Sequence, residues 1–180
     1  MNTFALEIFD DQGQVCTFYT VRWEDATLSE TDKFFQKFRY DEQLKNSLRE
    51  LASFLEVVIG DEHGALEYFF RFENAAQALP PSGTYKVQDI SIKYGNFPLR
   101  LYSLRISEKL VVLFNGGEKT AGTAQGGRTS MVFQEANIFA KRILDALQQK
   151  EICITTDQRA FSYYDDSYEI ITKVSELLKS

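Results

Sequence analysis

The segment Leu99–Thr120 (LRLYSLRISEKLVVLFNGGEKT) constrains the fold of this chain more than any other part. Asn96 and Pro98 mark a turn, and Leu99–Ile106 after it is predicted to be a strand. Lys109–Asn115 is apolar enough to be a central strand that is covered on both faces. Only Ser107 and Glu108 separate the two stretches, so we expect them to pair as an antiparallel hairpin.

Further strands are predicted on the N-terminal side of this hairpin. Tyr85–Tyr94 (YKVQDISIKY) alternates as a strand does, and it would complete a set of three antiparallel strands. Residues 3–9 and 15–23 are rich in β-branched and aromatic residues, and the polar run Asp10–Gly13 separates them. That pattern predicts an N-terminal β-hairpin.

Helices are predicted from capping residues and from apolar residues at helical spacing. Ser29 and Asp32 offer a start for a helix over Glu30–Arg39. Apolar stripes then predict a helix from Asp41, a long helix beginning near Val132, and a closing helix over Tyr168–Lys179. These stripes are typical of core-facing helix surfaces.

Taken together, the order of elements predicts an α+β fold. We expect an antiparallel sheet of about three to five strands with helices packed on one face, because consecutive strands with short connections favour that layout. The 180 residues fit one domain. Within it, an N-terminal hairpin would occupy residues 1–25, a core residues 30–150, and a C-terminal extension residues 151–180.

Charge is distributed unevenly along the chain. The net charge is −6, and residues 1–75 carry fifteen acidic and seven basic residues. From Lys93 to Arg128 there are six basic residues and two acidic ones. A basic segment in an acidic protein can present its charge to an anion such as RNA, a nucleotide or an acidic partner segment. The alternative is that these are ordinary solvated charges on the outer face of a sheet.

Several classes of chemistry are disfavoured by composition. The single histidine, His63, lies in a polar GDEHG turn, so a His-pair metal site within one chain is excluded and a solvated loop residue is expected. We predict no metal and no cofactor. Cys16 and Cys153 are two cysteines in apolar stretches, which indicates buried thiols rather than a disulfide framework. No apolar run is long enough for a membrane span and no secretory leader is evident, so a cytoplasmic location without membrane contact is expected.

The segment Gly122–Thr129 (GTAQGGRT) nearly matches the phosphate-binding loop GxxxxGK[ST], with Arg128 in place of the lysine. That lysine is a slim point charge that reaches the terminal phosphates, and arginine is not equivalent to it. The chain downstream is also short for a parallel nucleotide-binding sheet. A flexible glycine-rich linker is therefore the favoured interpretation of this segment.

The run Tyr85–Thr120 resembles the central sheet of the RelE/ParE superfamily of bacterial toxins, including its HigB-like, phage-related branch. The resemblance extends over roughly residues 30–150, with two helices before three antiparallel strands and a GGEKT end that is similar to the family's last strand. Lys93 lies seven residues before Arg100, as a functional lysine and arginine do in the RelE pattern. Lys119 lies near the position, at the end of the last strand, where the RelE pattern has a second functional basic residue.

This resemblance implies an mRNA endoribonuclease of a toxin–antitoxin pair, with an antitoxin protein and RNA or the ribosome as partners. Arg100 would bind phosphate, Lys93 would be the base or an electrostatic stabiliser, and Lys119 would be a second cation. Further RNA-binding candidates from the same basic segment are Lys86, Tyr102, Arg105 and Arg128. Alternation along a strand places Arg100 and Tyr102 on one face and Arg105 on the other.

Two other functions remain open from the sequence. Gln125 stands where such toxins carry a tyrosine, and an acidic chain is repelled by ribosomal RNA. The same scaffold could therefore be a non-catalytic interaction module, for example from a mobile element, in which the catalytic activity has been lost. It could also be a globular domain whose basic hairpin is only surface. The sequence predicts no oligomeric state.

Overall fold

A computed structural model of the chain describes residues 2–87, 89–119, 130–163 and 170–174. Its centre is a sheet of seven strands in the order β11-β1-β2-β8-β7-β4-β3. These strands are β1 (Asn2–Asp10), β2 (Thr17–Trp23), β3 (Arg71–Phe72), β4 (Gln77–Leu79), β7 (Leu99–Ser107), β8 (Leu110–Glu118) and β11 (Ile170–Val174). The α+β class is as predicted, but the sheet has more strands than expected.

Two antiparallel hairpins form the middle of this sheet. The predicted hairpins are confirmed as β1–β2 and β7–β8, with Ser107 opposite Leu110 at the tight turn of the second. The hairpins join through β2 and β8, which run parallel from Thr17 opposite Leu110 to Thr20 opposite Leu113. The sheet is therefore mixed, and the N-terminal hairpin is part of its centre.

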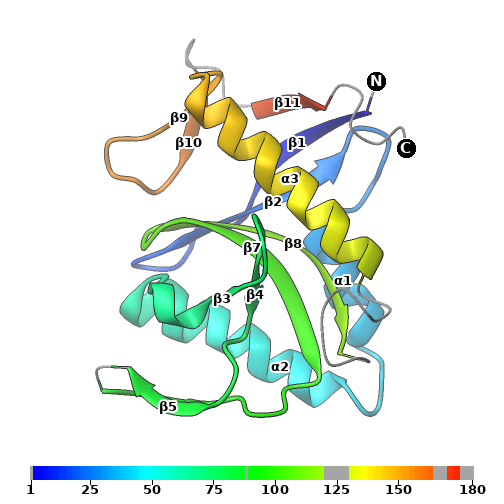
Figure 1. The fold of residues 1–180 in the computed structure, drawn as a ribbon, viewed down its shortest axis with the longest axis vertical. Helices are drawn as coiled ribbons and strands as arrows, with labels where there is room; N and C mark the ends of the chain where they lie inside the picture. Colours follow the sequence, from blue (N-terminus) through cyan, green and yellow to red (C-terminus); the bar gives the residue numbers. More distant parts are fainter. Residues whose placement is uncertain (1, 88, 120–129, 164–169, 175–180) are drawn as a thin grey trace.

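Helices cover both faces of the sheet, which corrects the prediction of one covered face. In Figure 1 the strands β7 and β8 run between α3 (Ser130–Gln148), in yellow, and α2 (Lys45–Ser53), in cyan. One apolar cluster joins α3 to residues such as Tyr102 and Phe114, and a second joins α1 (Glu30–Phe38), α2 and the following helix to Leu101 and Leu113. Two clusters form because neighbouring positions in β7 and β8 are apolar on alternate faces.

Helix α1 begins at the predicted residue and ends one residue before the predicted end, whereas α2 begins at Lys45, four residues after the predicted start. Ser29 caps α1 by accepting a hydrogen bond from the Asp32 N–H at 3.1 Å, as the sequence indicated. The helix that follows α2 without a break is a π-helix over Phe54–His63, and a 3-10 turn over Glu67–Phe69 comes next. The π-helix ends at Gly64, which has φ of 76° and donates to the Ile59 carbonyl.

The segment Tyr85–Tyr94 is a hairpin and not the single strand that was predicted. Its strands β5 (Thr84–Val87) and β6 (Ile90–Lys93) form a separate two-stranded sheet. A tight reversal keeps the alternation in phase, so that Tyr85 and Ile92 pair on one face. Alternation alone therefore cannot distinguish one long strand from this hairpin. The antiparallel neighbour of β7 is instead β4.

The C-terminal segment also differs from its prediction. Ile170–Val174 is strand β11, which pairs with β1 from Leu6 opposite Ile170 to Asn2 opposite Val174, although a helix was expected over Tyr168–Lys179. Its β-branched residues favour a strand, and β1 offers an open edge for pairing. A second small sheet pairs β9 (Ile152–Ile154) with β10 (Phe161–Tyr163).

Among the described residues, no helix has the length and apolar character that crossing a membrane requires.

Candidate functional site

Arg100, the predicted phosphate-binding residue, lies inside the protein. It alternates along β7 with Leu99 and Leu101, so its side chain is on the α3 side of the sheet, where Arg100 is 3% exposed. Its Nη1 atom lies 3.9 Å from Oε1 of Glu73, and among the described residues its Nε atom has no hydrogen-bond partner. Glu73 also lies 3.5 Å from Arg71. Arg100 is thus a member of an internal ion pair and is screened from ligands at the surface.

Tyr102 and Arg105 lie on opposite faces of the sheet, as alternation along β7 predicts. Tyr102 is fully buried on the α3 side, with its ring 5.3 Å from that of Phe133. Arg105 is on the α2 side, where its Nε atom donates to the Ala65 carbonyl and its Nη1 atom lies 3.8 Å from Glu67. Tyr102 and Arg105 were predicted to bind RNA, and in the structure both side chains contact other residues of the protein.

Lys93 and Lys86 share the solvent face of the β5–β6 hairpin. Lys86 is opposite Ser91, and Lys93 is opposite Thr84, so the two lysines are diagonal neighbours on that face. Both are exposed. The other face of the hairpin packs through Ile92 into the cluster on the α2 side. Lys93 and Arg100 are therefore on opposite sides of the seven-stranded sheet.

Lys119 lies just beyond the end of β8, where its backbone N–H donates to the Pro98 carbonyl at 2.7 Å. This hydrogen bond brings its backbone close to the start of β7, but Lys119 is exposed, whereas Arg100 is buried. Arg128 and the predicted loop Gly122–Thr129 lie outside the described residues. Within the described residues, the three catalytic candidates do not converge on one cleft.

A polar seam crosses the sheet at the point where β2 and β8 separate. The first turn of α1 enters this split, and Thr31 Oγ1 contacts both Thr20 Oγ1 at 2.7 Å and the Phe114 carbonyl at 3.1 Å. Glu30, which is 3% exposed, forms an ion pair with Lys33 at 2.5 Å. Buried polar groups must be hydrogen-bonded to be tolerated, and these groups satisfy one another.

Glu135 reaches the same seam from α3. It accepts a hydrogen bond from Trp23 Nε1 at 3.2 Å, and the Glu30 carboxyl group is near enough to influence its pKa. Burial raises the pKa of Glu135, and the nearby negative charge of Glu30 raises it further. The folded protein therefore holds the proton of Glu135 to higher pH than the unfolded chain does.

This pKa shift predicts a pH-dependent effect of Glu135→Gln. Between the pKa of the unfolded chain, near 4.3, and the raised pKa of the folded protein, the folded state binds more protons at Glu135 than the unfolded state does. The free energy of unfolding therefore falls as the pH rises through this range. The amide cannot ionise, yet its oxygen can still accept from Trp23. We expect the urea midpoint of Glu135→Gln to exceed that of the native protein at pH 7 and to approach it near pH 4. A lower midpoint at pH 7 would contradict this assignment, and the exposed Glu151→Gln is the control.

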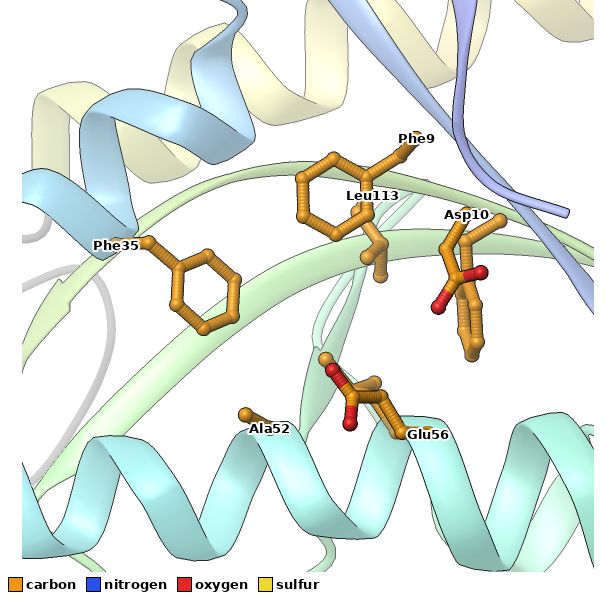
Figure 2. A pocket seen from close by; sticks show the side chains of 8 residues that line it. Phe9, Asp10, Phe35, Ala52, Glu56 and Leu113 are labelled. Atoms are coloured by element: carbon orange, nitrogen blue, oxygen red, sulfur yellow. The ribbon is translucent and has the colours of Figure 1, made fainter. Parts of the chain in front are cut away.

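A pocket with a mostly apolar lining lies on the α1 and α2 side. Its volume is about 240 Å³, and Phe18 and Leu113 lie at its base, where β2 and β8 run side by side. Figure 2 shows Phe9 and Phe35 on its walls. These two rings are stacked at a centroid distance of 6.0 Å and an interplanar angle of 21°. The remaining lining comes from α2 and the π-helix, with Ala52, Leu55 and Glu56.

Two carboxylates flank this apolar pocket. Asp10 projects from the end of β1 and Glu56 from the π-helix, so they reach the pocket from different elements (Figure 2). The β1–β2 turn is held against the π-helix, because the Gln14 N–H donates to Asp61 at 3.2 Å. An apolar hollow with a negative rim suits an apolar group that carries positive charge beside it.

Sequence reasoning missed this pocket, because its lining comes from segments that are far apart in the chain. One local signal was available: Phe35 lies beside the core residues Phe34 and Phe38 of α1 but outside their helical stripe. An aromatic residue next to an apolar stripe indicates a second contact surface. The acidic excess of residues 1–75 was recognised, and these residues supply every wall of the pocket except Leu113.

The other chemistry that the described residues could support is limited. No group of three or more His, Cys, Asp or Glu side chains in the described part of the chain is placed to hold a metal ion. Cys16 is fully buried, and burial raises the pKa of its thiol to about 12, so it is a poor nucleophile. Comparison of the chain with protein-family models, with curated proteins and with solved structures finds no match in any of the three.

Proposed function

We propose that this protein is a non-catalytic interaction module that binds a basic protein partner through its α1 and α2 side. The observation that carries the proposal is the position of Arg100, which is 3% exposed on the α3 side of the sheet and paired with Glu73. Phosphate cleavage by cationic groups requires that they converge on the scissile phosphate. The distribution of Arg100 and Lys93 over opposite sides of the sheet favours the non-catalytic function.

Charge supports a basic partner over a nucleic acid. The elements of the α1 and α2 side, apart from β7 and β8, belong mostly to residues 1–75, in which acidic residues outnumber basic ones by fifteen to seven. Such a surface repels the phosphate backbone of RNA and attracts Lys- or Arg-rich segments. Residues 30–53, which include α1 and α2, hold five acidic and five basic residues, so the acidic excess comes from residues 1–29 and 54–75, each with five acidic residues and one basic residue.

The proposal is tested by face-specific charge neutralisation. One variant replaces Asp10, Glu56 and Glu50 by their amides, and a matched variant replaces Asp145, Glu151 and Asp157, all exposed carboxylates on or after α3. A partner captured from the source cells is identified, purified and titrated against both variants by calorimetry. We expect binding to the first variant to weaken about tenfold or more and binding to the second to stay within about twofold. Equal effects would overturn the proposal.

The RelE-like endoribonuclease, with its antitoxin and RNA partners, stays the competing prediction. It is tested by inducible expression of the native protein, Lys93→Ala and Lys119→Ala, with cellular RNA mapped for new ends. These two residues are exposed, so their replacement leaves the fold intact. Growth arrest with new RNA ends that both substitutions abolish would establish the nuclease and overturn the interaction module. We expect no new ends from any of the three proteins.

A further inference from the structure

We propose that the pocket lined by Phe9, Phe35 and Leu55 is an anchor site for one phenylalanine or leucine side chain of a basic partner segment. The inference rests on the proposed function and deepens it, because it names the site and the chemistry of the bound segment. The pocket lies where β1, α1, α2 and the π-helix meet over β2 and β8 (Figure 2). Each element presents to it a side chain that suits this occupant.

The size of the pocket favours a single side chain. Its volume of about 240 Å³ is below the ~300–1,000 Å³ that is usual for sites of drug-sized ligands and cofactors. The base is rigid, since Phe18 is 2% exposed and Leu113 is fully buried in the centre of the sheet. A preformed apolar hollow with a rigid base is the usual receptor for an interface anchor residue.

The lining of the pocket favours an aromatic or branched aliphatic anchor. The partly exposed rings of Phe9 and Phe35 offer π-faces and edges, and Leu55 adds an aliphatic wall. A third ring can pack edge-to-face against such a pair, which adds about 0.5–1.5 kcal/mol to the burial of its area. Polar side chains would enter this lining without hydrogen-bond partners, so they are disfavoured.

The rim determines the charge beside the anchor. Asp10 and Glu56 flank the opening from two elements, and Asp61 is held at the adjacent turn. A segment with lysine or arginine on either side of its anchor can place a cation near each rim carboxylate. An acidic segment with the same anchor would meet like charges, which cost affinity and slow association. This charge complementarity identifies a basic polypeptide as the occupant.

The test uses three fluorescein-labelled synthetic peptides and fluorescence anisotropy. The first peptide is rich in lysine and arginine around one central phenylalanine, the second has alanine in place of that phenylalanine, and the third keeps phenylalanine between glutamates. We expect the first to bind about thirtyfold more tightly than the second and the third to show no saturable binding. Methyl chemical shifts of Leu55 and Leu113 should move only with the first peptide.

Two variants locate the binding in the pocket. Ala52→Trp fills the space from α2 and is expected to remove binding of the first peptide, with circular dichroism as the check on its fold. Asp10→Asn with Glu56→Gln keeps the apolar lining, and we expect about threefold to tenfold weaker binding with a smaller dependence on salt. The matched control is Asp145→Asn with Glu151→Gln, a pair of exposed carboxylates on and after α3, which should bind as the native protein does.

Several results would overturn the anchor site. They are equal binding of the first two peptides, no binding of any peptide at ~1 mM, native affinity in both pocket variants, or a dimer whose formation depends on Ala52 and excludes the peptide. The proposed function would survive these results if the purified partner still lost affinity in the α1 and α2 side variant. The proposed function would be overturned if the purified partner bound the α1 and α2 side variant with the same affinity as the native protein.

Discussion

Glu73→Gln is expected to lower the free energy of unfolding by about 3–5 kcal/mol, one of the two largest effects among the substitutions considered. Glu73 is the carboxylate that faces the buried guanidinium of Arg100 at 3.9 Å. The amide removes its negative charge and leaves the positive charge of Arg100 inside the protein. An uncompensated buried charge costs much more than a lost surface ion pair. Urea denaturation monitored by Trp23 fluorescence and circular dichroism measures the change.

Glu67→Gln is the matched control for this prediction. Glu67 also pairs with an arginine, Arg105, at 3.8 Å, but its side chain is 74% exposed. Its replacement should change the unfolding free energy by no more than about 0.5 kcal/mol. Similar losses in the two variants would mean that burial of Arg100 does not govern the stability of its ion pair.

Arg100→Met is expected to be milder than Glu73→Gln. The methionine removes the buried charge itself, and Glu73 keeps Arg71 at 3.5 Å as a partner. Buried ion pairs are often replaced by apolar side chains of similar volume at little cost. A well-folded Arg100→Met protein would also allow the role of Arg100 in any RNA cleavage to be measured apart from its role in stability.

Gly116→Ala is expected to destabilise the protein by about 3 kcal/mol or more. Gly116 lies in β8 opposite Leu101, and a Cβ atom at Gly116 would stand 1.9 Å from the Arg100 carbonyl oxygen. That neighbour is backbone, so the methyl group can be accommodated only if β8 and β7 move apart. Both strands are central to the sheet, and their hydrogen bonds would be disturbed. A large fall in the thermal midpoint is the expected readout.

Gly95→Ala provides a control of the same chemical change. No atom lies within 4 Å of a Cβ at Gly95. Its effect should be within about 0.5 kcal/mol, or slightly stabilising, because alanine reduces the freedom of the unfolded chain. If Gly116→Ala behaved like Gly95→Ala, the close approach of β7 and β8 at Gly116 would be refuted.

Local signals in the sequence predicted most of the helices and strands, but they could not predict which strands pair over long distances in the chain. Ser29 indicated the start of α1, and the short connection at Ser107 indicated the β7–β8 hairpin, because each signal lies within a few residues of the feature it specifies. The parallel contact of Thr17 with Leu110 has no such local mark. The apolar character of β8 did indicate a strand covered on both faces, although a single helical layer was expected.

The predicted site residues were chosen by residue type and by their place in the sequence pattern. Neither property shows whether a side chain is buried or exposed in the fold. Arginine is common on surfaces, and only the contact with Glu73 across the sheet shows why Arg100 is buried. The pocket could not be predicted at all, since Phe9, Phe35 and Leu113 become neighbours only through tertiary packing. Alternation did correctly separate Arg105 from Arg100, because that relation is local to one strand.

The parallel pairing of β2 with β8 has a consequence for synthesis on the ribosome. The β1–β2 hairpin is translated before its partner strands. Its β2 edge can pair only after β8 has been synthesised, and its β1 edge only after β11 has been synthesised. During that interval the nascent hairpin exposes two unpaired edges and the apolar side chains of Phe4 and Phe18, which are later buried. Slow elongation between the codons of β2 and those of β8 and β11 therefore lengthens the aggregation-prone stage of this chain, whereas fast elongation shortens it.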